Sequence, residues 1–447
     1  MAHFENKLIK KFQQLLLILL LFIYIYGCAP ALEEKQFQPP ETVLSDNPCL
    51  YSESVGARSQ GYLYKQDNTQ WYYYINGDNN NESLPANWRN WWYVYLNGVP
   101  VDREISFTVY NGGWPLYYMP VYSYDEVNWY RLDESEVSEL EGYTWHILKK
   151  FEKPAVWLAR FYPYSTNDLN KYLTKIKSNV NVRLSAIGKT RQNHPICMIT
   201  ITDFTNPDVN KKRVWIHART HPGETPPSFL LEGLIDYLLA NTTDSKTALS
   251  KLIFTIVPMQ NVDGVMAGNY RSNTDGDNLE VMWYYDPYNP SQIDAGSPLE
   301  VVALHETIQR LISSGPQFTI ALNLHSANTS ANRHAFFITH FGPTTRGYSD
   351  MESSLWRKQV KFMNNVAYYY GAQFIEPPAR DGGRDFLNRE YPEKWWWASQ
   401  KDSVMAITME TTYGRAGNRH NWITPQDLYE LGIATAKAIV DYNNSLK

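Results

Sequence analysis

The sequence predicts an all-β module followed by an α/β domain with a largely buried sheet, and two patterns support this. Between residues 51 and 164, short aromatic and β-branched runs such as "WYYYI" and "ISFTVY" are separated by turn clusters such as "NGDNNN", which is typical of a β-sandwich. After residue 164, apolar strand-like runs alternate with helical patterns, which favours an α/β layer.

The second part contains five runs that we predict as strands: "KRVWIHA", "LIFTIVP", "FTIALNL", "HAFFITH" and "SVMAITM". A helix is predicted at residues 229–239, where leucine and isoleucine recur on one face. The last helix is predicted to begin at Thr424-Pro425, with Asp427 at its third position, and to end near Tyr442.

The composition allows an enzyme and argues against a nucleic-acid partner. The 447 residues, 43% of them hydrophobic, suffice for two or three domains. With 41 basic and 46 acidic residues the net charge is -5, so the chain lacks the basic excess that neutralises phosphates. Aromatic residues make up 15% of the chain. They are densest in the β-rich part, where they indicate stacked or exposed rings and would also suit a glycan-binding surface.

The chain begins with a pattern typical of a targeting signal. Lysines precede the apolar stretch "LLLILLLFIYIY", which is short for a membrane span. The following "IYGC" resembles a bacterial lipobox with Cys28 as the acylated thiol. We therefore expect a signal peptide at residues 1–27, a polar linker at 28–48, and secretion across the cytoplasmic membrane. Membrane contact would come only through a lipid anchor on Cys28 at a bacterial cell envelope.

Two further cysteines, Cys49 and Cys197, are left after Cys28. They could pair in an oxidising compartment, but the sequence does not supply the geometry that a disulfide requires. Paired and free thiols both remain open.

The stretch "WIHARTHPGETPPS" contains the first candidate metal ligands, His221 and Glu224. They follow a predicted strand, at the end where α/β sheets place their ligands. A type II turn at Pro222-Gly223 would bring the two side chains together. Imidazole and carboxylate are normal zinc ligands, and a catalytic zinc has three protein ligands and one open position. The third ligand must come from elsewhere in the chain.

Other candidates stand at the ends of two later strands. His325 ends the run "FTIALNLHS", and Glu410 follows "SVMAITM". A carboxylate at such a place can take the proton of a zinc-activated water. Taken singly, a histidine or glutamate at a strand end is more often structural. His217 is a rival ligand, although its strand alternation suits a core or supporting role.

The motifs H-P-G-E, "PMQNVDGVMAGNYR", "NLHS" and "TMETTYG" occur in an order that resembles the zinc carboxypeptidase family, in particular its cytosolic-carboxypeptidase-like branch. That branch also carries a β-sandwich before the peptidase domain. The resemblance implies a β-sandwich domain at residues 49–164 and a catalytic domain at residues 165–447. The catalytic domain would be α/β, with a mixed sheet in an α/β/α arrangement.

The resemblance also implies roles for individual residues. His221, Glu224 and His325 would hold one zinc ion per chain, and Glu410 would act as general base and acid. Arg271 would polarise the scissile carbonyl and stabilise the oxyanion. The substrate would be a peptide or another amide.

One motif departs from the family pattern. The family continues with D-L-N-R-x-W, whose Asn and Arg hold the terminal carboxylate of the substrate, whereas this chain reads "NLEVMW" with Glu280 and Val281 at those places. The arginine fork is lost, and a carboxylate near Glu280 would be repelled. Either Glu280 pairs with a cationic group, or other arginines replace the anchor: Arg380, Arg384 and Arg389.

Three hypotheses therefore remain. The first is a zinc metallocarboxypeptidase, in which Tyr391 is the nearest match to the family's substrate-binding tyrosine. The second is a zinc amidase or deacylase of the same fold that needs no free C-terminal carboxylate. The third is a non-catalytic binding lipoprotein at the cell surface, in which the aromatic sandwich binds the ligand.

Overall fold

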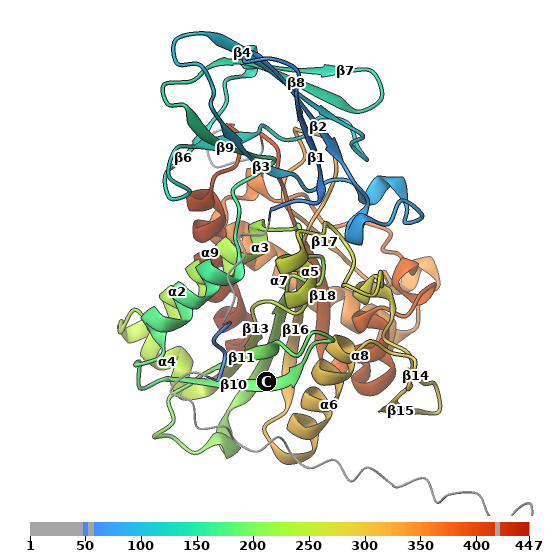
Figure 1. Ribbon diagram of the computed structural model, residues 1–447. Helices are drawn as coiled ribbons and strands as arrows, with labels where there is room; N and C mark the ends of the chain where they lie inside the picture. The colour runs from blue at the N-terminus through green and yellow to red at the C-terminus, as the bar shows by residue number, and fades with distance from the viewer. Residues whose placement is uncertain (1–47, 52–57, 416–420, 447) are drawn as a thin grey trace, which may run out of the picture. The chain divides into compact units, whose positions relative to one another are not determined.

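The computed structural model describes residues 48–51, 58–415 and 421–446 (Figure 1). The predicted signal peptide, Cys28 and nearly all of the predicted linker lie outside the described residues. Within the described ranges, no helix is both long enough and apolar enough to cross a membrane.

The first part of the chain forms two β-sheets, which confirms the predicted all-β region. The five-stranded sheet has the order β1 (Gly61–Lys65), β2 (Gln70–Ile75), β4 (Glu104–Tyr110), β8 (Thr144–Lys150) and β7 (Val137–Leu140). The four-stranded sheet has the order β3 (Tyr93–Asn97), β9 (Ala155–Ala159), β5 (Val121–Ser123) and β6 (Trp129–Arg131). Buried aromatic rings, among them Trp92, Phe107 and Trp145, pack in one shared core.

Tyrosines also stack on the outer side of the five-stranded sheet, as the sequence predicted. The rings of Tyr74 and Tyr110 are stacked with centroids 4.8 Å apart, and Tyr72 stacks against Tyr110 at 6.1 Å. Because β2 and β4 pair in parallel, alternate residues on the two strands face the same side and their rings meet.

The second part of the chain is built on a seven-stranded mixed sheet. Its order is β10 (Val182–Lys189), β11 (Pro195–Ile201), β13 (Leu252–Val257), β12 (Lys212–Ala218), β16 (Phe318–Ser326), β18 (Met405–Thr411) and β17 (Phe336–Ile338). The four strands from β13 to β18 run parallel, whereas β10, β11 and β17 are joined by antiparallel pairs. All five predicted strands are present. A separate hairpin consists of β14 (Tyr285–Asp286) and β15 (Asn289–Ile293).

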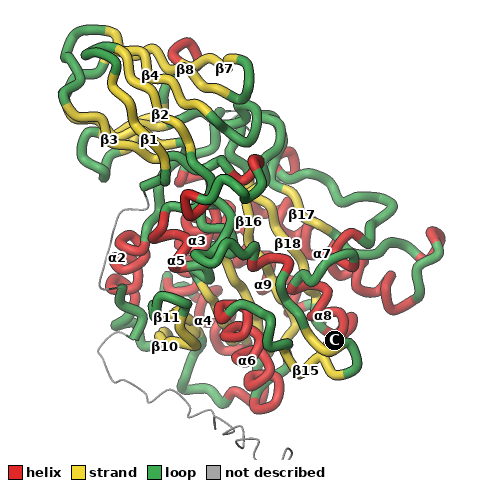
Figure 2. Tube along the Cα trace, turned by 45° about the vertical axis from the view of Figure 1, so that its right-hand side comes forward, coloured by secondary structure: helices red, strands yellow, loops and turns green. Residues whose placement is uncertain are grey.

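Helices lie on both sides of this sheet, which confirms the α/β/α arrangement (Figures 1 and 2). They are α2 (Thr166–Ile176), α3 (Pro226–Leu239), α4 (Thr243–Lys251), α5 (Val262–Ala267), α6 (Leu299–Ser314), α7 (Asp350–Tyr370), α8 (Pro392–Gln400) and α9 (Pro425–Asn444). As predicted, α9 begins at a capping box in which Thr424 accepts from the backbone of Asp427.

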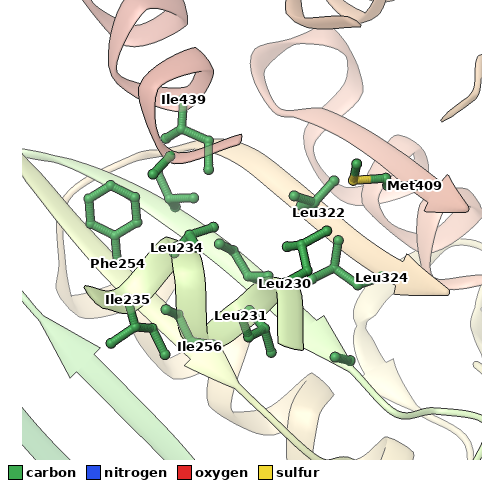
Figure 3. Packing of buried hydrophobic residues seen from close by; sticks show 14 of the residues in the cluster. Leu230, Leu231, Leu234, Ile235, Phe254, Ile256, Leu322, Leu324, Met409 and Ile439 are labelled. Carbon is green, nitrogen blue, oxygen red and sulfur yellow. The ribbon is translucent and has the colours of Figure 1, made fainter. Parts of the chain in front are cut away.

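Strand alternation assigns each face of the sheet to its own core. On β16, Ile320, Leu322 and Leu324 face the core formed with α3 and α9. Figure 3 shows leucines of α3 packed beside Leu322 and Leu324. Ala321 on β16 and Ala406 on β18 face the other core, which includes residues of α6 and α8. The residues that follow on this second face, towards the carboxyl ends of the strands, are polar.

Cys49 and Cys197 form a disulfide with their Cα atoms 5.1 Å apart, which settles the pairing that the sequence left open. The bond joins the segment before the sandwich to β11 across 148 residues of chain. Both cysteines are fully buried.

Replacing both cysteines with alanine is expected to lower the free energy of unfolding by about 3–5 kcal/mol, because the unfolded chain loses a long-loop constraint. Chemical denaturation measures the effect. Wild type denatured in the presence of reductant should lose a similar amount. A double variant as stable as the oxidised wild type would contradict a stabilising disulfide.

Candidate active site

The candidate site stands at the carboxyl ends of the central parallel strands. On the face shared with α6 and α8, β16 carries Asn323 and His325, and β18 carries Thr408 and Glu410. In the strand register His325 lies beside Glu410, and Asn323 lies beside Thr408. These pairs form two rows of polar side chains, roughly 7 Å apart along the strands.

The turn after β12 carries the predicted pair His221 and Glu224. The buried Arg219 has φ 57° and donates through its guanidinium to the carbonyl oxygen of Pro222. The predicted type II turn is wrong, because Gly223 does not have the positive φ that this turn requires. Glycine is needed there for close packing, since a Cβ would lie 2.7 Å from the Tyr270 ring.

Three donor atoms converge at this turn. His221 Nδ1 lies 2.9 Å from Glu224 Oε1 and 3.1 Å from His325 Nδ1, and His325 Nδ1 lies 3.0 Å from Glu224 Oε2. Ligand atoms around a tetrahedral zinc are about 3.3 Å apart, given bonds near 2.05 Å. The three buried residues thus form a group that could hold a metal ion.

The charges of this group favour a cation. Burial would raise the pKa of Glu224, but the neighbouring His221 and His325 hold it well below its usual value. Burial opposes a charge on His325, yet Glu280 and Glu224 raise the pKa of that imidazole well above its usual value. The carboxylates therefore attract positive charge to the point where the two Nδ1 atoms meet, and a bound metal would supply it.

Two side chains of the "NLEVMW" motif, Asn278 and Glu280, orient the histidines. His221 Nε2 lies 3.0 Å from Asn278 Oδ1, so it donates there and leaves Nδ1 free to bind a metal. His325 Nε2 lies 3.0 Å from Glu280 Oε2. Glu280, which the sequence suggested as a source of repulsion, is thus hydrogen-bonded to a candidate ligand.

Glu410 and Arg271 line the same pocket as His221 and His325, a cavity of about 340 Å³. Burial raises the pKa of Glu410 to about 8, and a bound cation would lower it. No residue in the described part of the chain hydrogen-bonds to its buried Oε2 atom. Tyr391 also lines the pocket. The structure therefore brings the candidate catalytic residues together beside the candidate ligands.

The arginines suggested as a replacement anchor do not join this site. Arg380, Arg384 and Arg389 are all exposed, and the described pocket lining contains none of them. Arg384 pairs with Glu352 at 3.3 Å. His217 is buried and accepts from the indole of Trp215, consistent with a core position.

The loop that carries Arg271 is held by a carboxylate from the sandwich. Asp78 Oδ1 accepts from the backbone of Tyr270 at 2.7 Å. Its Oδ2 accepts from the backbones of Arg271 and Ser272 at 2.8 and 2.7 Å. Asp78 is buried, so it fixes the backbone from which the Arg271 side chain enters the pocket.

Sequence reasoning missed two groups of residues around the site. Asn323 and Thr408 interrupt apolar strands two residues before His325 and Glu410, and this spacing places them on the same face, so a signal existed. Glu393 and Asp78 carried no such signal, because one lies at a helix start and the other in a polar turn cluster.

Two family models match the chain. The model described as zinc carboxypeptidase matches residues 169–431, and the model described as cytosolic carboxypeptidase N-terminal domain matches residues 61–161. The first match alone covers more than half of the chain.

Curated relatives and solved structures agree with these matches. Cytosolic carboxypeptidase 2 of Mus musculus is 27% identical over 231 residues, which are 48% of this chain and 26% of that protein. Cytosolic carboxypeptidase 6 of Mus musculus is 32% identical over 182 residues, 39% of this chain and 32% of that protein. The aligned part of the chain thus spans about a quarter to a third of the length of these relatives.

Among solved structures, a metallo-carboxypeptidase from Burkholderia cenocepacia shares the fold with a TM-score of 0.70 at 21% identity, covering 88% of this chain and 98% of that one. The prediction of a secreted, lipid-anchored protein is wrong by this comparison, because the curated relatives are named cytosolic carboxypeptidases. The resemblance drawn from the four sequence motifs is confirmed: the chain belongs to the zinc carboxypeptidase family.

Proposed function

We propose that the protein is a zinc-dependent metallocarboxypeptidase that hydrolyses a peptide bond at its substrate's C-terminal end. His221, Glu224 and His325 would hold one zinc ion. The observation that carries the proposal is the convergence of these three donor groups beside Glu410 and Arg271 in one pocket. The donor set of two imidazoles and one carboxylate is the kind that leaves an open position on a catalytic zinc.

The residues of the chain divide the reaction between them. When bound, zinc would supply Lewis-acid activation of a water molecule. Glu410 accepts a proton from the attacking water and returns it to the leaving amine. Arg271 donates to the carbonyl oxygen as negative charge develops there, with its backbone held by Asp78. Glu280 and Asn278 fix the orientations of the two histidines.

The proposal is tested with one peptide prepared as a free acid and as its C-terminal amide. A carboxypeptidase should cleave the free acid at least about tenfold faster, since a charged hydrogen bond to the carboxylate is worth about 1.5–3 kcal/mol. The ratio of kcat/KM between the two peptides is the measurement. Absence of hydrolysis by protein shown to contain zinc would contradict the proposed activity.

A specific observation favours a second candidate, an amidase or deacylase of the same fold. In the described lining of the pocket, Arg271 is the one arginine or lysine, and Glu280 stands where the family pattern has a carboxylate-binding residue. Equal rates on the free acid and the amide would assign this second activity, because recognition would then not depend on the terminal charge.

A further inference from the structure

The pocket beside the candidate metal centre contains more acidic than basic groups. Its described lining includes the carboxylates of Glu280, Glu393 and Glu410 against the guanidinium of Arg271. A divalent ion with Glu224 as its ligand would add one positive charge. With all three lining carboxylates ionised, the metal-bound site would still carry a net negative charge. This charge disfavours an acidic side chain on the leaving residue of the substrate and favours a cationic one.

Glu393 contacts the row formed by Asn323 and Thr408, which precedes the row of His325 and Glu410 along the strands. It stands in the first turn of α8 and is buried, and its Oε1 accepts from Thr408 Oγ1 at 2.7 Å and Asn323 Nδ2 at 3.1 Å. Asn323 Nδ2 also lies 3.1 Å from Glu280 Oε1, so one neutral amide bridges two carboxylates. Both side-chain bonds to Glu393 use Oε1, and Oε2 takes part in neither.

A second observation points to a ligand in the same pocket. His340 is 2% exposed and lines the pocket, and its Nε2 has no hydrogen-bond partner among the described residues. Burial lowers the pKa of His340 to about 3, so the imidazole is neutral. A neutral imidazole nitrogen can accept an N–H. A buried polar atom without a partner is costly, and a ligand donor would remove that cost.

The walls of the pocket complete the match to a long amphipathic side chain. Ile338, Phe386 and Tyr391 line it together with the polar groups. Ile338 on β17 lies beside Thr408 in the strand register, next to the hydroxyl that holds Glu393. Side chains such as lysine bury an apolar stem and pair their charged end. The spacing between the two rows, roughly 7 Å, suits the extended length of such a stem.

We propose that Glu393 makes the pocket selective for a substrate whose leaving residue carries a side-chain ammonium or guanidinium group. The inference rests on the proposed hydrolase function and names its substrate class. The aliphatic stem lies against Ile338 and Phe386, and the cationic end binds Glu393 and His340. Glu393 is a specificity residue and takes no part in the proton transfers.

The test uses the zinc-loaded full chain at pH 8 and benzoyl-glycyl dipeptides that end in lysine, arginine, norleucine or glutamate. Lysine or arginine should exceed norleucine in kcat/KM by on the order of tenfold to a hundredfold, the worth of a charged hydrogen bond, and glutamate should be poorest. The lysine-to-arginine ratio distinguishes an ammonium site from a guanidinium site. Norleucine or glutamate cleaved as fast as both cationic peptides would overturn the inference.

Glu393→Gln should reduce the preference for the cationic peptide over norleucine towards one, because an amide cannot pair with the charge. Glu390→Gln is the matched control, since Glu390 pairs with Lys394 at 2.6 Å and stands three residues earlier in the chain. This control should keep the wild-type preference. A preference that survives Glu393→Gln would overturn the role of Glu393. If that variant does not fold, the wild-type substrate ratios still decide the selectivity.

Measuring peptide binding without hydrolysis tests this inference independently of the proposed hydrolytic activity. Calorimetry with zinc-loaded Glu410→Gln should give at least about tenfold tighter binding of a cationic peptide than of the norleucine peptide. Cationic preference in binding, without hydrolysis of any peptide by wild type, would support the inference and contradict the proposed function. Hydrolysis of all peptides without preference would do the reverse.

Discussion

Glu410→Gln is expected to retain about one zinc per chain and to lose at least about a hundredfold in kcat. The glutamine cannot accept the proton of the attacking water, and general-base catalysis of this kind contributes on the order of 10²–10⁴-fold. Glu410 is not one of the three residues of the candidate metal group, so its replacement removes none of the donor atoms. Zinc content by atomic emission and kcat on a cleaved peptide are the two measurements.

The contrasting variant is His221→Ala, which removes a candidate ligand and the hydrogen bond to Asn278. Zinc and activity should both be lost. Comparison of His221→Ala with Glu410→Gln then separates metal binding from proton transfer. A fully active Glu410→Gln protein would end the proposed mechanism. A His221→Ala protein that keeps stoichiometric zinc would end the proposed ligand set.

The positions of the three donor groups and Glu410 could be predicted because strand geometry is local. His325 and Glu410 each stand at the end of an apolar strand, and parallel strands bring their carboxyl ends to one edge of the sheet. The register that places them side by side follows from β16 and β18 being neighbours. The sequence alone does not state which strands are neighbours, and the family resemblance supplied that information.

The acidic character of the pocket could not be predicted in the same way. Glu280 stands out in the sequence because it breaks a motif, but its bonds to His325 and Asn323 depend on where a loop folds back over the sheet. Glu393 enters from α8, whose sequence "PEKWWWASQ" suggests only bulky packing. Its proximity to Thr408 is a tertiary contact between segments 15 residues apart, and no periodicity indicates it.

Asp78→Ala is expected to lower both stability and turnover although Asp78 belongs to the sandwich. Its carboxylate satisfies three backbone N–H groups of residues 270–272, and buried donors left without acceptors cost about 1–3 kcal/mol each. The free energy of unfolding should fall by about 3–5 kcal/mol. Because the released loop no longer positions the guanidinium of Arg271 in the pocket, kcat should fall on the order of tenfold to a hundredfold, with zinc retained.

Asp78→Asn and Asp125→Ala decide whether the loss of turnover is specific. An asparagine keeps one acceptor oxygen but turns an amide N–H towards backbone donors, so its effects should be smaller than those of alanine and of the same kind. Asp125 is an exposed sandwich aspartate that accepts from the backbones of Val127 and Asn128 in its own turn. Its replacement should cost stability and leave kcat unchanged in assays well below the melting temperature. If kcat falls equally in Asp78→Ala and Asp125→Ala, the loss comes from general destabilisation of the sandwich. The position of the Arg271 side chain would then not explain it.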